Sequence, residues 1–91
     1  MTKKTVNFNQ KGINKLPNDK PVLYKIETER GNPNYTGVAK KGRVQERISE
    51  HLGEIPGAKV KIEQFSSIRA AQKKEANVIK RIQPKYNEMG K

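Results

Sequence analysis

Hydrophobic and polar residues alternate in three short stretches of the chain. The first begins at Val22 and places Tyr24 and Ile26 on the same face, because side chains alternate along a strand. The second, over about 34–38, follows a segment rich in Gly, Asn and Pro, so the two stretches are typical of a hairpin. The third, over about 60–65, alternates Val and Ile with Lys and Glu. We expect it to pair with the hairpin.

Two other stretches repeat apolar residues with helical spacing. Val44, Ile48 and Leu52 recur every four residues, which predicts a helix over about 43–53 with one buried face. A second helix is expected over about 68–83, closed by a proline. Its apolar stripe consists of Ile68, Ala71, Ile79 and Ile82. The predicted order is strand, strand, helix, strand, helix, an α+β fold with a small antiparallel three-stranded sheet flanked by helices.

The first sixteen residues differ from the rest of the chain. Residues 1–16 are polar and rich in Lys and Asn, and we expect an N-terminal basic arm ahead of a single domain over 17–91. Phe8, Ile13 and Leu16 are apolar positions within this arm. The arm either packs these side chains on the sheet, with one helical turn, or forms a disordered tail. The pattern alone leaves both interpretations open.

The composition of the chain indicates the size of its core and the kind of partner that it binds. Of 91 residues only 32% are hydrophobic, which allows one domain with a modest core. The formal net charge is +11, from 20 Lys and Arg against 9 Asp and Glu. So large an excess of positive charge indicates a polyanionic partner, and nucleic acid is the first candidate.

The sequence also excludes several other classes. It contains no cysteine, so disulfide bonds and thiolate zinc sites are impossible. The basic N-terminus leads into polar residues and does not match a signal peptide, and no apolar run is long enough to span a bilayer. We expect a cytoplasmic protein without a membrane partner. The N-terminal Met favours a complete small protein, the alternative being a domain excised from a longer chain.

Glu75 falls inside the apolar stripe of the last predicted helix. A carboxylate on a buried face is costly unless it is paired or bound to a cation. Glu75 therefore either forms a structural ion pair with Arg47 or a lysine, or is a metal ligand at a phosphodiester site. On the middle helix, Arg47 and His51 lie roughly 20 to 60° to one side of Val44, at the edge of the buried face.

Taken in order, these residues resemble the motifs of the GIY-YIG nuclease family. The matching parts are Val22-Leu23-Tyr24, Tyr35-Thr36-Gly37, Arg47 followed by His51, Glu75, and Pro84-Lys85-Tyr86-Asn87. The resemblance covers about residues 16–87. Each tripeptide is a weak signal alone, since a strand tyrosine is more often a core residue, but five parts in the same order are specific.

The chain departs from the family pattern at three places. The first tripeptide lacks its glycine and isoleucine, and Thr36 stands where isoleucine is usual. The segment from Tyr35 to Arg47 is about two residues longer than the commonest form, which places an insertion around residues 40–42. Arg43 is consequently an alternative for the family's arginine, and the spacing to His51 favours Arg47.

The resemblance implies an endonuclease that hydrolyses phosphodiester bonds of nucleic acid, with DNA preferred, using one divalent cation. Glu75 would bind Mg²⁺ or Mn²⁺, since a carboxylate supplies the hard oxygen ligand that these ions prefer. Asn87 would support the Glu75 end of the site by hydrogen bonds. The alternative function is a non-catalytic basic nucleic-acid-binding module that retains the nuclease fold.

The remaining motif residues take catalytic roles by the same resemblance. Tyr24 would accept or relay the proton of the attacking water, although a phenol is a poor base at neutral pH unless nearby cations lower its pKa. Arg47 would provide such a charge or neutralise the phosphate directly. Tyr35 would orient the water or a phosphate oxygen, and His51 would position the nucleophile or exchange protons with Tyr24.

Overall fold

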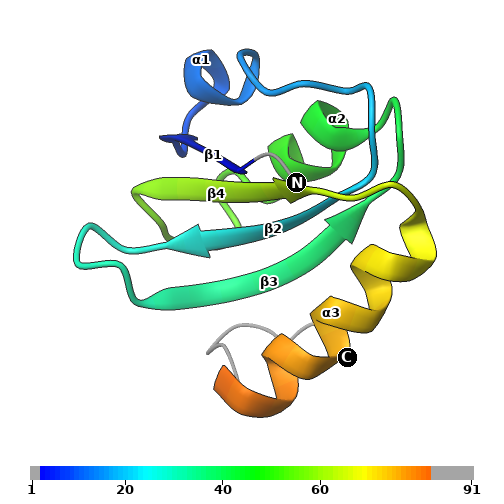
Figure 1. Ribbon diagram of the computed structural model, residues 1–91. Coiled ribbons are helices and arrows are strands. Elements are labelled where there is room, and N and C mark those ends of the chain that lie inside the picture. Colours follow the sequence, from blue (N-terminus) through cyan, green and yellow to red (C-terminus); the bar gives the residue numbers. More distant parts are fainter. Residues whose placement is uncertain (1–2, 83–91) are drawn as a thin grey trace.

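The computed structural model describes residues 3–82, and its fold is α+β (Figure 1). Four strands form one antiparallel sheet in the order β1-β4-β2-β3, and three helices pack on it. The elements are β1 (Lys3–Asn7), α1 (Gln10–Ile13), β2 (Val22–Glu27), β3 (Pro33–Ala39), α2 (Val44–Ser49), β4 (Lys59–Gln64) and α3 (Ile68–Ile82). No helix within residues 3–82 is long and apolar enough to cross a membrane.

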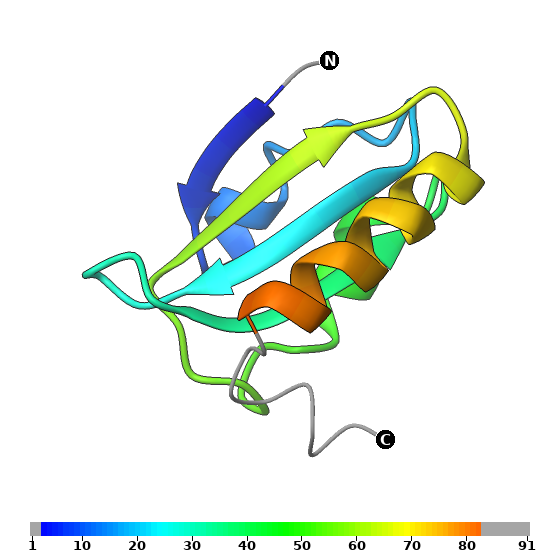
Figure 2. The same ribbon diagram turned by 60° about the horizontal axis from the view of Figure 1, so that its bottom comes forward.

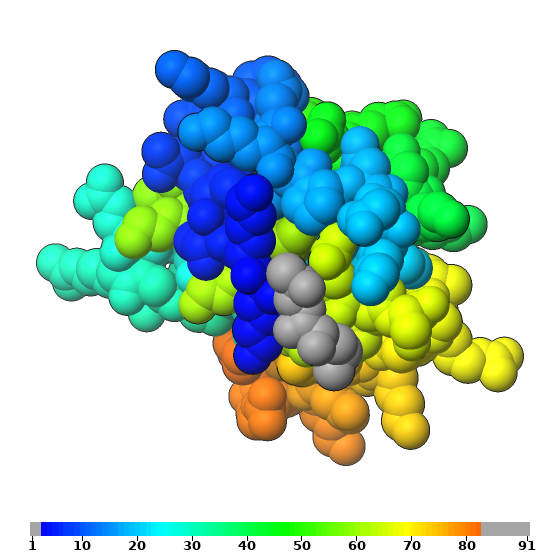
Figure 3. Space-filling view, turned by 45° about the horizontal axis from the view of Figure 1, so that its top comes forward, coloured from blue at the N-terminus to red at the C-terminus, as the bar shows by residue number. Residues whose placement is uncertain are grey.

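The expected three-stranded sheet is wrong, because the N-terminal segment supplies a fourth strand. β1 pairs with β4, with Val6 opposite Val60, and the short helix α1 follows it. Figure 3 shows β1 and α1, in dark blue, side by side on the surface. Ile13 is fully buried and Leu16 nearly so. Of the two interpretations of this segment, the packed one is therefore correct for residues 3–16.

The hairpin lies where the alternation predicted it. β2 has the predicted bounds, and β3 extends one residue further than predicted at each end. In the register of the pair, Tyr24 lies opposite Gly37 and Ile26 lies opposite Tyr35. Gly31 has a φ of +86° in the connecting turn, a conformation that glycine adopts without steric cost. The register places both tyrosines on one face of the sheet.

The two faces of the sheet carry different cores. The larger core lies on the face covered by α1 and α2, and it contains Tyr24 together with Val22, Ile26, Val60 and the helix residues Val44 and Ile48. The smaller core lies under α3 and contains Leu23, Phe65, Ala71 and Val78. Figure 2 shows α3 crossing the sheet over β3 and the neighbouring part of β2. Since β3 is an edge strand, α2 and α3 approach each other around that edge.

α2 is shorter than the periodicity predicted. It ends at Ser49, and the chain continues in turns as far as Ile55. The His51 N–H donates to the Ile48 carbonyl at 3.1 Å, and the His51 carbonyl accepts from the N–H groups of Glu54 and Ile55. His51 thus belongs to a hydrogen-bonded turn and not to the helix, which fixes its backbone beside the sheet.

The buried face of α3 also differs from the predicted stripe. Ala71 and Val78 are buried, whereas Ile82 is 37% exposed. The two buried positions are seven residues apart, about two helical turns, so they lie on the same face of the helix. Lys74, which is not part of the predicted stripe, faces the sheet and donates to Glu63 at 2.7 Å. The partner carboxylate on β4 explains how a lysine is accommodated there.

Candidate active site

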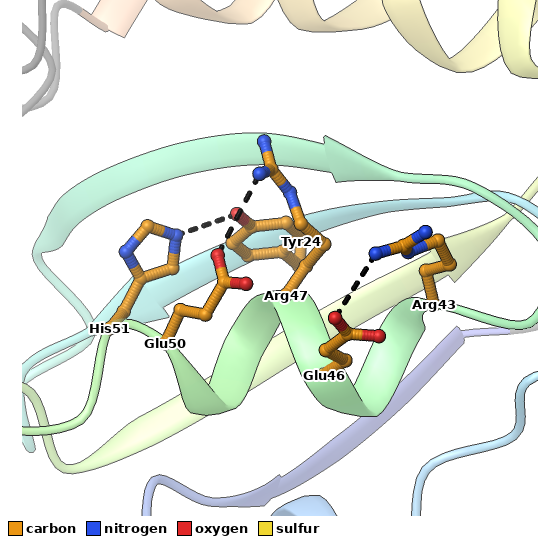
Figure 4. Close-up of polar contacts among 6 residues, drawn as sticks. All are labelled: Tyr24, Arg43, Glu46, Arg47, Glu50 and His51. Atoms are coloured by element: carbon orange, nitrogen blue, oxygen red, sulfur yellow. Dashed lines mark hydrogen bonds and ion pairs between the residues drawn. The ribbon is translucent and has the colours of Figure 1, made fainter.

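The Tyr24 hydroxyl and His51 Nε2 lie 2.8 Å apart, within hydrogen-bond distance (Figure 4). Tyr24 is 1% exposed, in the middle of β2. Its burial raises the pKa of the phenol well above the ordinary value. The neighbouring Tyr35 phenol raises this pKa further, the charge of Arg47 lowers it, and the charge of Glu75 raises it. Tyr24 is therefore a neutral phenol at physiological pH.

His51 is a neutral imidazole under the same conditions. Burial lowers its pKa below the ordinary 6.5, and the charge of Arg47 acts in the same direction, while Glu54 and Glu50 oppose the shift. His51 Nδ1 is buried and has no hydrogen-bond partner among residues 3–82. A neutral ring next to a phenol can accept its proton, so the pair can transfer a proton without first ionising the tyrosine.

Three aromatic rings and one glycine form the wall of the site. The ring centroids of Tyr35 and His51 are 4.6 Å apart, and those of Tyr24 and Tyr35 are 6.1 Å apart. A Cβ at Gly37 would lie 2.7 Å from the Tyr24 hydroxyl oxygen and 3.0 Å from Tyr35 Cε2. The ring of Tyr24, which lies opposite this glycine, therefore occupies the space that a side chain at position 37 would need.

Gly37→Ala is expected to destabilise the fold by about 1–3 kcal/mol, because the added methyl group has no space beside the Tyr24 ring. Urea unfolding followed by circular dichroism measures this change. The substitution should also weaken the hydrogen bond between Tyr24 and His51, since the ring can yield only by moving away from His51. A variant as stable as the wild type would show that the strand pairing at Gly37 is wrong.

Two arginines of the α2 region line a hollow at the free edge of β3. Arg47 lies 3.7 Å from Glu50, and Arg43 lies 3.1 Å from Glu46 (Figure 4). The hollow has a volume of about 380 Å³. Its lining consists of Val38, Lys40, Arg43, Arg47, Glu50, Ile68 and Gln72. Both ion pairs are more than half exposed and worth little, so either guanidinium can turn to an incoming phosphate.

Arg47 is the arginine whose charge acts on the phenol. It lowers the pKa of Tyr24, although burial and the Tyr35 phenol outweigh this effect. Figure 4 shows the Arg47 side chain extending from α2 on the same side as the Tyr24 hydroxyl. The geometry thus supports the choice of Arg47 over Arg43 that the spacing to His51 suggested, and it leaves Arg43 in the same hollow as a second cation.

Glu75 approaches the site from α3. Its side chain is half-buried, and this burial raises its pKa. No ion pair involves Glu75 among residues 3–82, and the acidic partner of Arg47 is Glu50. The structural ion pair that the sequence left open is therefore absent from the described part of the chain. The charge of Glu75 acts on the Tyr24 pKa, so the two groups lie within electrostatic reach.

Glu75 can supply one oxygen ligand to a hard divalent cation. A half-buried carboxylate without a positive partner among residues 3–82 supplies an oxygen ligand that Mg²⁺ or Mn²⁺ favours. The same residues contain no group of three or more His, Cys, Asp or Glu that could hold a metal ion. A cation at Glu75 would consequently keep most of its ligands from water or substrate, as Mg²⁺ does when it assists phosphate chemistry.

The structure brings three of the six candidate residues into contact and leaves two more within electrostatic reach of them. Tyr24, Tyr35 and His51 are in contact, and Arg47 and Glu75 act electrostatically on the phenol. The sixth candidate, Asn87, lies outside the described residues, as do the rest of the C-terminal motif residues 84–87. The sequence did not single out Gln72, which lines the hollow three residues before Glu75, a spacing that shares a helix face.

The chain was compared with protein-family models, curated protein sequences and solved structures. No family model and no curated protein sequence matches the chain. Among solved structures, the chain is similar to the GIY-YIG N-terminal endonuclease domain of UvrC from Thermotoga maritima, which was solved bound to its catalytic divalent cation, magnesium. The TM-score is 0.70 and the sequence identity 27%, over 85% of this chain and 92% of the other.

Proposed function

We propose that this chain, which has a GIY-YIG-like nuclease fold, is a divalent-metal-dependent endonuclease that hydrolyses phosphodiester bonds of nucleic acid, with DNA preferred. The observation that supports it best is the buried Tyr24 phenol, hydrogen-bonded to neutral His51 and within electrostatic reach of Arg47 and Glu75. A core tyrosine without a role would need neither a titratable partner nor opposite charges nearby.

The proton pathway follows from the two pKa shifts. With its proton on Nδ1, neutral His51 accepts a hydrogen bond from the Tyr24 hydroxyl at Nε2. When water attacks phosphorus, its proton moves to the Tyr24 oxygen while the phenolic proton moves to Nε2. The water oxygen forms a new bond to phosphorus, the bond from phosphorus to the leaving oxygen breaks, and the released alkoxide takes a proton from solvent. Because Tyr24 is never a free phenolate, its raised pKa is compatible with this role.

The other side chains act on the phosphate and the water. Arg47 can leave the exposed contact with Glu50 and donate its forked N–H groups to the phosphate oxygens, where negative charge develops. The Tyr35 ring packs on His51 and holds the imidazole in place. Glu75 would bind the cation, and the structural relative was solved with magnesium bound. When bound, that cation supplies Lewis-acid stabilisation of the phosphate and the leaving oxygen.

The rate of cleavage should rise with pH through the lowered pKa of His51, somewhere below 6.5, and then level off, because only the neutral ring accepts the Tyr24 proton. Cleavage rates at saturating Mg²⁺ over about pH 5 to 8, for the wild type and for His51→Gln, measure this. The inflection should be absent in His51→Gln. If both proteins show the same inflection, His51 does not receive the proton.

The same shift affects stability with a defined sign. Since the folded-state pKa of His51 lies below its unfolded value, its contribution is fully present above pH 6.5 and is lost as the pH falls through the folded-state pKa. Urea unfolding of the wild type should therefore show a loss of stability below about pH 6 that His51→Gln does not share.

The proposal itself is tested by incubating labelled single-stranded, duplex and branched DNA, and RNA of the same sequence, with Mg²⁺, with Mn²⁺ and with EDTA. Cleavage that requires the divalent cation and yields products of defined length supports an endonuclease. Tight binding with no cleavage of any substrate in either metal would contradict it and favour a binding module that retains the fold.

A further inference from the structure

We propose that the uncovered half of the sheet, on the side that carries α3, is a second nucleic-acid contact that binds backbone phosphates away from the active site. Its cations are Lys3, Lys25, Lys61, Lys74 and Arg81, and we name this group the cationic sheet face. The inference rests on the proposed function only in taking nucleic acid as the ligand. It concerns binding and requires no cleavage.

Strand register places these side chains together. Lys3 on β1 lies opposite Glu63 on β4, and Lys25 on β2 lies opposite Lys61 on β4. Residues that face each other in an antiparallel pair project to the same side of the sheet. Figure 2 shows that α3 covers β3 and part of β2 on this side and does not cross β4 or β1. Lys3 and Lys61 are accordingly exposed.

The cationic sheet face surrounds a shallow hollow of about 140 Å³, between the strands and α3. Only two of its cations have a carboxylate partner within residues 3–82. Lys74 lies 2.7 Å from Glu63, and Lys61 lies 3.8 Å from Glu27. The other three, Lys3, Lys25 and Arg81, have no ion pair in the described part of the chain. The face therefore has an excess of positive charge.

The pairing of Lys25 with Lys61 does not stabilise the fold. Like charges directly opposite each other in a strand pair are unfavourable, and Lys25 faces Lys61. A bound anion removes this repulsion, and a row of phosphates provides several anions at once. Acidic lipid fits less well, because the surrounding exposed strand residues are Thr5, Asn7 and Lys59, without an apolar side chain to enter a bilayer.

The cationic sheet face lies where one continuous nucleic acid could contact both this face and the active site. Lys74 and Glu75 are neighbours on α3, so the cationic sheet face and the active site flank the same helix. Across the sheet, β1 is three strand spacings from β3, roughly 14 Å. A duplex carries one charge per about 1.7 Å of its axis and can therefore engage both places. The face would hold the substrate while the site at the β3 edge acts on it.

The test is binding of a fluorescent 20-base-pair duplex in EDTA, measured by anisotropy over a range of salt concentrations. Lys3→Gln/Lys25→Gln removes two cations that lack ion pairs on the face. The matched control, Lys11→Gln/Lys15→Gln, removes the same charge from the α1 region, in the opposite layer. The face variant should bind about tenfold more weakly, with a salt slope smaller by about 2, because each removed lysine leaves one phosphate without its cation.

The control variant should bind within about twofold of the wild type, with an unchanged slope. Equal weakening of both variants would overturn the proposal, since net charge alone would explain it, and so would wild-type affinity in the face variant. Thermal unfolding guards against misfolding, because removing Lys25 relieves the repulsion with Lys61 and should not lower the melting temperature. If wild-type protein binds the duplex but cleaves none of the DNA or RNA substrates in Mg²⁺ or Mn²⁺, the proposed function fails and this inference stands.

Discussion

Glu75→Gln is expected to lower metal-dependent cleavage by about 10³-fold, because it removes the carboxylate proposed to hold the cation while keeping the size of the side chain. Gel analysis of labelled DNA in Mg²⁺ measures the rate. Glu29→Gln is the matched control, since it removes the same charge from an exposed position in the β2–β3 turn. Cleavage undiminished in Glu75→Gln would eliminate the mechanism even though the fold is correct.

The same variant should fold as well as the wild type. Burial raises the pKa of Glu75, so its contribution to stability is present below the unfolded-state pKa and is lost as the pH rises through the folded-state pKa. Near neutrality the ionised carboxylate therefore opposes folding when no cation is present, and a neutral amide avoids this cost. Loss of activity in a well-folded Glu75→Gln protein would thus report on chemistry and not on structure.

Tyr24→Phe is expected to lower cleavage by about 10²–10⁴-fold, because the ring remains in the core but the proton relay to His51 is removed. Single-turnover rates at saturating Mg²⁺ measure this loss without contributions from product release. The variant should retain duplex affinity in EDTA, since Tyr24→Phe keeps the ring and leaves unchanged the positive charges that bind DNA phosphates.

A double-variant comparison separates a relay from two independent roles. If Tyr24 and His51 pass one proton, Tyr24→Phe combined with His51→Gln should be little worse than the more damaging single variant. A loss of cleavage rate in the double variant equal to the product of the two single-variant losses would contradict the relay, because it would mean that each residue acts alone.

The hairpin was the part of the fold most readily predicted from sequence. Alternation predicted the face of Tyr24, whereas the pairing of Tyr24 with Gly37 is known only from the strand register. The strand β1 was missed because its residues 3–7 contain a single apolar side chain, Val6, and the rest are polar and exposed. An edge strand with one weakly buried side has little hydrophobic alternation to detect.

The positions of α2 and α3 along the chain were predicted from sequence, but the residues that they bury were not. The isoleucines predicted the buried stripe of α3, but the residues buried in the structure are Ala71 and Val78. The apolar part of the sheet beneath the helix is small, and these are the two helix positions buried against it. Only the tertiary structure sets which turn is covered. Likewise, the spacing of His51 after Arg47 was read as helical, whereas a turn carries the histidine to the phenol.

The candidate site was predicted from the order of the motifs along the chain and not from any single residue. Periodicity marked Glu75 as an unusual carboxylate but left an ion pair open, and the absence of such a pair within residues 3–82 required coordinates. The opposite pKa shifts of Tyr24 and His51 depend on burial and on neighbours from other elements, which no linear pattern encodes. Asn87 lies outside the described residues and stays a prediction.

Direct titration with Mn²⁺, followed by electron paramagnetic resonance of the free ion, tests whether Glu75 is the ligand of a catalytic cation. The account predicts one bound Mn²⁺ per wild-type chain, and binding at least tenfold weaker in Glu75→Gln than in Glu29→Gln. Equal Mn²⁺ affinity in all three proteins, or no binding to the wild type, would contradict it.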